Sequence, residues 1–205
     1  DHYLFQRADQ VCDTREGFTV NDLTYDDDMI SGVRGTDSEG KEEIISAPIV
    51  MGCDGPNSII ARKLGLYKMD MKNTAIAIRC YYEGIEGLTD QIELHYVSEV
   101  KPGYFWLFPA GDGRANIGLG LSKDDAKKED RSLGDILDEI TRSDYFKERF
   151  KNARPLEKPI GWNLPMGSIH RKNHGDGFML LGDAAGLVDP FTGEGIGNAM
   201  FSAKY

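Results

Sequence analysis

The segment Gly182–Met200, GDAAGLVDPFTGEGIGNAM, has residue types that suit the binding of a small molecule. It is rich in glycine, carries few charges and follows the short apolar run Phe178–Leu181. Asp183 comes just after this expected strand, where open α/β folds place ligands, and its carboxylate can accept hydrogen bonds from sugar-like hydroxyls. Thr192–Gly197 leads into an expected helix whose N-terminal amides favour anions or carbonyl oxygens. The simpler alternative is a glycine-rich turn before an amphipathic helix.

A second acidic turn lies in Met51–Arg62, MGCDGPNSIIAR. An apolar strand again ends in Asp54-Gly55, and a helix capped by Ser58 or Asn57 is expected to follow and to stop at Gly65. Taken alone, this segment is equally typical of an ordinary strand, turn and helix, because Asp-Gly is a general turn signal.

A third group combines three aromatic residues on one face of an expected strand with two glycines on the next strand. These residues are Tyr104, Trp106, Phe108, Gly118 and Gly120. Strand alternation puts the aromatic side chains on a common side, where they could wall a long apolar cavity that the glycines leave open. The alternative is a set of core aromatics in an antiparallel sheet.

Together the first two segments resemble the flavoprotein monooxygenase and reductase superfamily, typified by aromatic hydroxylases. The superfamily carries a D-G-x-x-S-x-x-R segment, matched here by Asp54–Arg62 with the arginine one place later. It also carries a G-D-A-A-x-x-x-x-P-x-x-G-x-G segment, matched by Gly182–Gly195. Within it, Tyr104–Gly120 is similar to the Y-x-W-x-F-P-x8-G-x-G signature of geranylgeranyl reductases, which hydrogenate isoprenoid double bonds.

The resemblance implies FAD as cofactor, with Asp183 binding its ribityl chain, the loop from Pro190 to Gly195 beside the isoalloxazine ring, and the Asp54 segment near the pyrophosphate. The implied cofactor-binding residues are Asp54, Gly55, Gly182, Asp183, Ala184, Pro190, Gly193, Gly195 and Ile196. The implied substrate-binding residues are Tyr104, Trp106, Phe108, Gly118 and Gly120. Reduced flavin would deliver hydride to a prenyl C=C bond, with electrons from NADPH or a reduced iron–sulfur carrier.

Other features of the superfamily are absent from this sequence. It has no G-x-G-x-x-G element and no C-x-G-G element, and its first residue is Asp1 rather than Met. We therefore expect an interior fragment of a longer enzyme that is inactive alone. The sequence identifies no catalytic acid or base, and His95, His170 and His174 are interpreted as surface or hydrogen-bonded residues.

Composition restricts the partners. The net charge is −10 over 205 residues, which argues against nucleic acid and against electrostatic docking on anionic lipid. We expect a cytoplasmic protein with an isoprenoid or other apolar small-molecule substrate; transient contact with the membrane surface to collect lipid and the oligomeric state stay open. Cys12, Cys53 and Cys80 form no CxxC pair, so we expect no metal site and no disulfide but three reduced, mostly buried thiols.

The expected fold is mixed, α+β / α/β: part of a FAD-binding domain plus an antiparallel-sheet substrate domain with covering helices. Residues 17–50 read as a strand meander, and four alternating runs between Thr74 and Leu121 predict an antiparallel sheet. A Ser-x-x-Asp box at Ser132 predicts a helix. Residues 1–66 and 167–205 are assigned to the flavin domain and residues 67–166 to the substrate domain.

Two other functions remain open from the sequence. A flavin-dependent monooxygenase or halogenase would consume oxygen, although halogenases carry W-x-W-x-I-P where this chain has Tyr104–Pro109. A non-catalytic lipid-binding module of the same fold would show no flavin absorbance.

Overall fold

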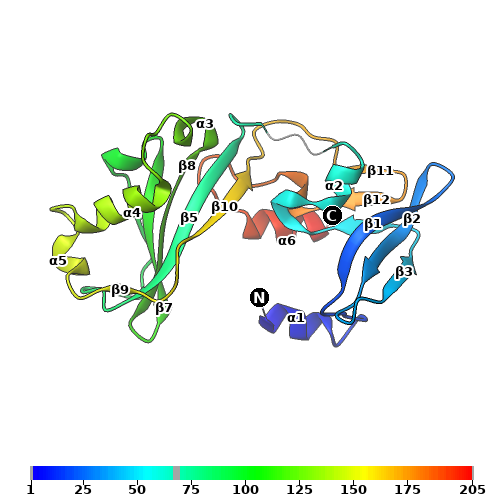
Figure 1. Ribbon diagram of the computed structural model, residues 1–205, viewed down its shortest axis with the longest axis horizontal. Coiled ribbons are helices and arrows are strands. Elements are labelled where there is room, and N and C mark those ends of the chain that lie inside the picture. Colours follow the sequence, from blue (N-terminus) through cyan, green and yellow to red (C-terminus); the bar gives the residue numbers. More distant parts are fainter. Residues whose placement is uncertain (1, 67–69, 205) are drawn as a thin grey trace. The chain divides into compact units, whose positions relative to one another are not determined.

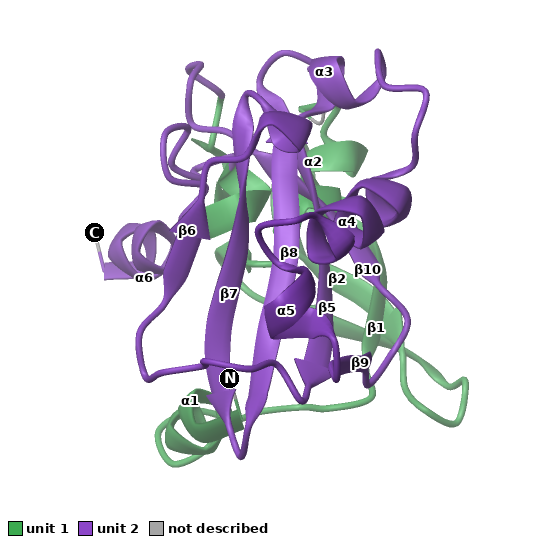
Figure 2. Ribbon diagram, turned by 90° about the vertical axis from the view of Figure 1, so that its left-hand side faces the viewer, with its two compact units in different colours: residues 1–67, 172–185 green, residues 68–171, 186–205 purple. Residues whose placement is uncertain are grey.

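A computed structural model describes residues 2–66 and 70–204 of the chain (Figure 1). The chain divides into two compact units, each built from two separate stretches of sequence. Unit 1 is formed by residues 1–67 and 172–185, and unit 2 by residues 68–171 and 186–205 (Figure 2).

Unit 1 contains two small sheets. Its elements are α1 (His2–Ala8), β1 (Thr19–Asp26), β2 (Met29–Thr36), β3 (Glu42–Ser46), β4 (Val50–Gly52), the 3-10 turn η1 (Gly55–Asn57), α2 (Ile59–Lys63), β11 (His174–Gly175), β12 (Phe178–Leu180) and the 3-10 turn η3 (Gly182–Ala185). Strands β1, β2 and β3 form an antiparallel meander, which confirms the strands expected over 17–50. In the second sheet, β12 pairs with β11 in the antiparallel sense and with β4 in the parallel sense.

Unit 2 is built on a six-stranded antiparallel sheet. Its elements are β5 (Thr74–Glu83), β6 (Glu93–His95), η2 (Ser98–Val100), β7 (Gly103–Gly111), β8 (Arg114–Ser122), α3 (Lys123–Ala126), α4 (Leu133–Arg142), α5 (Lys147–Phe150), β9 (Arg154–Pro155), β10 (Ile160–Pro165) and α6 (Ile196–Lys204). The strand order is β10-β5-β8-β7-β6, with β9 also pairing with β5. The antiparallel sheet expected from the alternating runs is confirmed.

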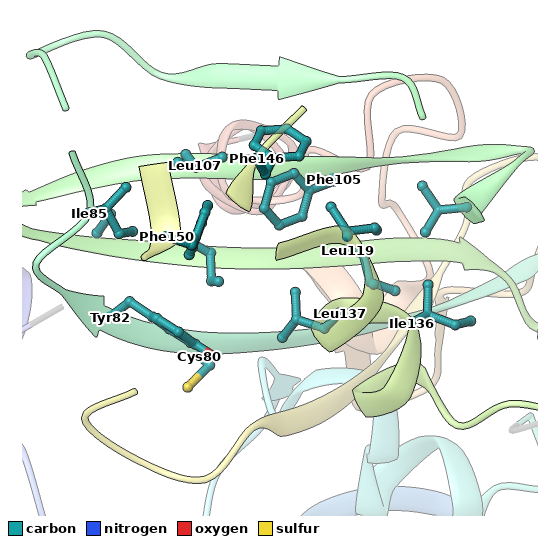
Figure 3. Packing of buried hydrophobic residues seen from close by; sticks show 14 of the residues in the cluster. Cys80, Tyr82, Ile85, Phe105, Leu107, Leu119, Ile136, Leu137, Phe146 and Phe150 are labelled. Carbon is teal, nitrogen blue, oxygen red and sulfur yellow. The ribbon is translucent and has the colours of Figure 1, made fainter. Parts of the chain in front are cut away.

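The main core of unit 2 lies between one face of this sheet and helices α4 and α5 (Figures 2 and 3). Phe105 and Leu107 of β7 are fully buried there, against Ile136, Leu137 and Ile140 of α4. Helix α4 begins where the sequence predicts, because the Ser132 hydroxyl accepts from the Asp135 N–H while the Asp135 carboxylate accepts from the Ser132 N–H.

The opposite face of the sheet has small residues at its centre. Register pairs Ala77 with Gly120 and Ala75 with Ser122 across β5 and β8, and Trp106 with Gly118 across β7 and β8. Directly paired residues point to the same side of a sheet, so small side chains on β5 and β8 lie beside the aromatic side chains of β7. This arrangement leaves a depression on the face that α4 and α5 do not cover.

The thiols are all unpaired, and only Cys80 is buried; Cys12 and Cys53 are exposed. The expectation of mostly buried cysteines is therefore wrong, because Cys12 follows the exposed helix α1 and Cys53 begins a turn. Within the described residues, no three His, Cys, Asp or Glu side chains gather to hold a metal ion. No helix in that part of the chain combines the length and the apolar composition needed to cross a membrane.

Candidate functional site

The two acidic glycine turns of unit 1 lie side by side. Strands β4 and β12 are parallel, with Leu180 in register with Gly52, and the Leu181 N–H continues the pairing by donating to the Gly52 carbonyl over 2.9 Å. The turns η1 and η3 follow these strand ends and contact each other. The segments are far apart in sequence, but the fold brings both to the carboxyl edge of one sheet, the edge at which α/β proteins bind ligands.

The two aspartates of these turns differ in their partners. One oxygen of Asp54 accepts the Ile59 N–H over 2.7 Å at the start of α2, and Ser58 caps the same helix by accepting from the Ala61 N–H. Of the two expected caps, Ser58 is confirmed and Asn57 is wrong. Gly55 between them has φ of 75°, a left-handed conformation that glycine adopts without strain. Part of the Asp54 carboxylate is therefore occupied in holding α2.

Asp183 is half-buried in η3, and no described residue donates a hydrogen bond to its carboxylate. Burial raises the pKa of this carboxyl above its ordinary value. Gly182 before it is buried with φ of 54°, and Ala184 after it is half-buried. A partly desolvated carboxylate without donors is costly, so a ligand that brings hydroxyl donors would stabilise it.

In unit 2, Asp189 shapes the turn that follows. One oxygen of its carboxylate accepts the N–H groups of Phe191 and Thr192, at 3.1 and 2.6 Å, and the Thr192 hydroxyl at 2.7 Å. These hydrogen bonds, the Thr192 side chain first, hold the pKa of Asp189 below its usual range. Gly193 closes the turn with φ of 73° and donates to the Asp189 carbonyl. The exposed Pro190 is thereby held in a defined turn.

Helix α6 begins two residues after this turn. The Glu194 carboxylate accepts the Gly197 N–H over 2.5 Å, so one of the N-terminal amides of α6 is satisfied within the protein. Gly195 lies half-buried before the helix, and Ile196, its first residue, is 77% exposed. The apolar side chain of Ile196 has no cover within this unit.

The segment before the turn is anchored by side chains that sequence reasoning did not identify. Arg171 donates to the carbonyls of Met166 and Gly186, at 2.7 and 3.1 Å. Its guanidinium fills the space above Gly186, where a Cβ would come within 2.5 Å of it. Asn198 of α6 donates to the Leu187 carbonyl over 2.8 Å. The start of the glycine-rich segment is thus fixed from two sides.

A cavity of about 520 Å³ lies on the open face of the unit 2 sheet. Its floor includes Ala75, Ala77 and Gly120, and Tyr104 and Trp106 form one wall. Further lining residues come from the loops and from β10: Lys72, Lys101, Leu164, Met166, Ser168, Pro190, Phe191 and Gly193. The lining is mainly apolar, and the volume is large enough for a small organic molecule rather than only a few waters.

Not all residues of the aromatic and glycine motif line the cavity. Trp106 donates its indole N–H to Asn116 over 2.9 Å and stacks on Phe108 with ring centroids 5.9 Å apart. Phe108 and Gly118 are outside the lining of this cavity, whereas Tyr104, Trp106 and Gly120 belong to it. A Cβ on Gly118 would lie 2.3 Å from both the Trp106 ring and the Ile78 carbonyl. Gly118 therefore makes room for the indole itself.

Several residues at these sites carried weak or no sequence signals. Asp189 could have been found, since an Asp-Pro-x-Thr run is typical of a side-chain-stabilised turn. Arg171, Lys72 and Lys101 lie in loops without periodicity, and only the folded chain brings them to the site.

The chain is similar to known proteins. The family model of the FAD binding domain matches residues 2–204. The chain is 34% identical to a digeranylgeranylglycerophospholipid reductase of Methanosarcina acetivorans over 89% of this chain and 44% of the relative. It is 33% identical to digeranylgeranylglycerophospholipid reductase 2 of Methanothermobacter thermautotrophicus over 100% of this chain and 51% of the relative. The chain thus spans about half the length of the curated relatives it matches.

Solved structures share the fold. A geranylgeranyl bacteriochlorophyll reductase-like protein from Thermoplasma acidophilum superimposes with a TM-score of 0.86 at 22% identity, covering 98% of this chain and 49% of that protein. The myxobacterial chondrochloren halogenase gives 0.79 at 22% identity, covering 98% and 48%. The expected mixed fold and the resemblance to geranylgeranyl reductases are confirmed. The match over nearly the whole sequence shows that the chain belongs to the FAD binding domain family.

Proposed function

We propose that this chain is part of a FAD-dependent reductase that saturates C=C bonds in the isoprenoid chains of phospholipids. The names of the curated relatives support the substrate class. The observation that carries the proposal is the cavity of unit 2, whose mainly apolar lining and aromatic wall suit a hydrocarbon chain. When bound, FAD would supply the hydride, and the protein would position the chain and exclude water.

The residues of unit 1 fit the cofactor in one testable respect. The Asp183 carboxylate is partly buried without a described donor, and the hydroxyls of a ribityl chain would provide donors. We propose Gly182, Asp183 and Ala184 as the ribityl-binding residues and Asp54 and Gly55 as their neighbours nearer the pyrophosphate. Pro190, Gly193, Gly195 and Ile196 are proposed to border the flavin ring.

On the substrate side, we propose that Tyr104, Trp106 and Gly120 contact the isoprenoid chain. Phe108 and Gly118 would not contact the chain but would position the indole of Trp106, Phe108 by stacking on it and Gly118 by leaving room for it. We keep the proposed division into a flavin domain of residues 1–66 and 167–205 and a substrate domain of residues 67–166. Pro190, Phe191 and Gly193 line the cavity within unit 2.

The test uses the full-length enzyme with FAD, under anaerobic conditions, and a geranylgeranyl lipid as substrate. With the flavin reduced by dithionite, the enzyme should add two hydrogen atoms to each double bond of the lipid. Mass spectrometry of the lipid product measures this gain. Comparison of NADPH and reduced ferredoxin then identifies the electron donor. Loss of flavin absorbance after purification with FAD would favour a non-catalytic lipid-binding module.

Halogenases among the solved structures with this fold favour a second candidate, a flavin-dependent halogenase or monooxygenase. Such an enzyme would consume oxygen with its substrate and would give no hydrogenated lipid anaerobically. Because a lipid substrate lies in a bilayer, we also propose transient contact with the membrane surface.

A further inference from the structure

The cavity of unit 2 has an unusual charge for this protein. The chain as a whole has a net charge of −10, yet the cavity lining includes Lys72 and Lys101 and no aspartate or glutamate. Among the described residues, neither lysine forms an ion pair. The acidic residue nearest to Lys72 in sequence, Asp70, instead accepts the Lys72 N–H and the Asn73 side-chain amide, at 3.0 and 2.7 Å. The one nearest to Lys101, Glu99, accepts the Ser98 hydroxyl over 3.0 Å. The two ammonium groups are thus available to a ligand.

Both lysines lie at the same end of the cavity. Lys72 precedes β5 and Lys101 precedes β7, and these strands begin beside the end of β8, where Ala75 pairs with Ser122 and Gly103 with Leu121. Ser168, which follows β10, adds an exposed hydroxyl to the lining. This end of the cavity is therefore cationic and polar.

The lining changes character along the strands. Ala77 lies two residues beyond Ala75 on β5, a rise of about 6.6 Å, and Trp106 lies three residues beyond Gly103 on β7. Here the lining includes Ala77, Gly120, the Trp106 ring and Tyr104, which pairs with Gly120. A molecule that matches both ends would have an anionic head and an apolar chain.

We propose that Lys72 and Lys101 bind the phosphate of an anionic isoprenoid lipid and direct its chain along Ala77 and Gly120 toward Trp106. This inference rests on the proposed function of the cavity. A lysine ammonium is a compact charge that binds phosphate well, and two of them without competing carboxylates favour an anion. The site would discriminate lipids by headgroup charge and would fix which double bonds the chain presents for reduction.

The test compares geranylgeranyl phosphate with geranylgeraniol as substrates of the full-length FAD-loaded enzyme. The wild-type enzyme should have the lower KM for the phosphate. Lys72→Ala and Lys101→Ala should each raise that KM about tenfold, equivalent to about 1.4 kcal/mol, and the double variant should raise it further. The KM for geranylgeraniol should rise much less in these variants, because the alcohol carries no negative charge for the ammonium groups to bind, and the flavin spectrum checks that each variant is loaded with FAD.

Lys158→Ala is the matched control, because Lys158 is exposed, has no described partner and lies outside the cavity lining. It should leave both KM values unchanged. Added KCl should raise the wild-type KM for the phosphate and leave that for the alcohol unchanged, because salt screens exposed charges.

The outcomes separate the two proposals. If both lipids are reduced with equal KM, or if the lysine variants weaken both lipids equally, the headgroup site is wrong and the reductase function stands. If neither lipid is reduced by the flavin-loaded enzyme, the proposed function fails and the headgroup site with it.

Discussion

The Tyr104 hydroxyl donates a hydrogen bond to the main-chain carbonyl of Thr192. Tyr104 belongs to the aromatic wall of the cavity, and Thr192 lies in the turn that Asp189 organises. Burial raises the pKa of Tyr104, so its hydroxyl keeps its proton at neutral pH and stays a donor. Within unit 2, one hydrogen bond thus joins the wall of the proposed substrate cavity to the loop proposed to border the flavin.

Tyr104→Phe should therefore loosen the turn while keeping the aromatic ring. We expect a stability loss of about 1 kcal/mol and a several-fold fall in kcat/KM for the isoprenoid substrate of the full-length enzyme. Thermal unfolding and steady-state kinetics measure the two effects. Tyr145→Phe is the control, since Tyr145 is 73% exposed, away from this cavity. Wild-type kcat/KM in Tyr104→Phe would show that the hydrogen bond does not serve turnover.

Asp183→Asn should weaken FAD binding in the full-length protein. A hydrogen bond to a charged group contributes about 1.5–3 kcal/mol, so the Kd should rise by roughly tenfold to a hundredfold. Flavin fluorescence titration measures the Kd. Asp176→Asn provides the control, because Asp176 is an exposed aspartate of the same unit with no described side-chain partner. An unchanged Kd for Asp183→Asn would remove Asp183 from the proposed cofactor site.

Asp183 should also make FAD affinity depend on pH. In the folded protein without ligand, burial raises the pKa of Asp183 above its value in the unfolded chain. Its contribution to folding stability is therefore fully present below the unfolded pKa and is lost as the pH rises through the folded pKa. Ribityl donors would favour the ionised form and lower this pKa. We therefore expect FAD affinity to fall as the pH is lowered through the raised pKa of the free Asp183 carboxyl, and Asp183→Asn to flatten this fall. An identical pH profile in the variant would contradict the assignment.

Gly118 and Gly120 lie two residues apart on β8, but they should respond differently to alanine. A Cβ on Gly118 would collide with the Ile78 carbonyl and the Trp106 ring, whereas on Gly120 its nearest neighbour would be 3.5 Å away. Gly118→Ala should therefore cost about 1–3 kcal/mol of stability. Gly120→Ala should keep the wild-type Tm and raise the KM for the isoprenoid by filling the cavity floor. Equal Tm values for the two variants would contradict this distinction.

The sequence predicted much of this architecture because alternation and turn chemistry are local signals. The sheet of unit 2 follows from the side-chain alternation of β5, β7 and β8, and helix α4 follows from the Ser132 box. The roles of individual site residues depend on long-range packing and were harder to predict from the sequence. The pairing of β4 with β12 brings the two acidic turns to one sheet edge, and only the folded chain shows that the Asp54 carboxylate is partly used by α2 while Asp183 lacks a described partner.

Gly118 and Gly120 also show that the role of a single residue depends on long-range packing. Alternation places Gly118 and Gly120 on the same face, and the sequence alone assigned both to keeping the cavity open. Their difference comes from the orientation of Trp106, whose indole lies over Gly118 and is held by Asn116. Likewise, Lys72 and Lys101 line the same cavity only because β5 and β7 begin at the same end of the sheet.

Trp106 and Phe105 are neighbours on β7 that face opposite sides of the sheet, and truncating each should separate stability from substrate binding. Phe105 is fully buried in the core, so Phe105→Ala should cost about 3–5 kcal/mol of stability. Trp106 is only partly buried and lines the cavity, so Trp106→Ala should cost less, with flavin retained. Its main effect should be a raised KM for the isoprenoid substrate. Denaturant unfolding, the flavin spectrum and steady-state kinetics on the full-length enzyme measure these effects. A large stability loss with unchanged KM in Trp106→Ala would show that Trp106 is a structural residue and that the lipid binds elsewhere.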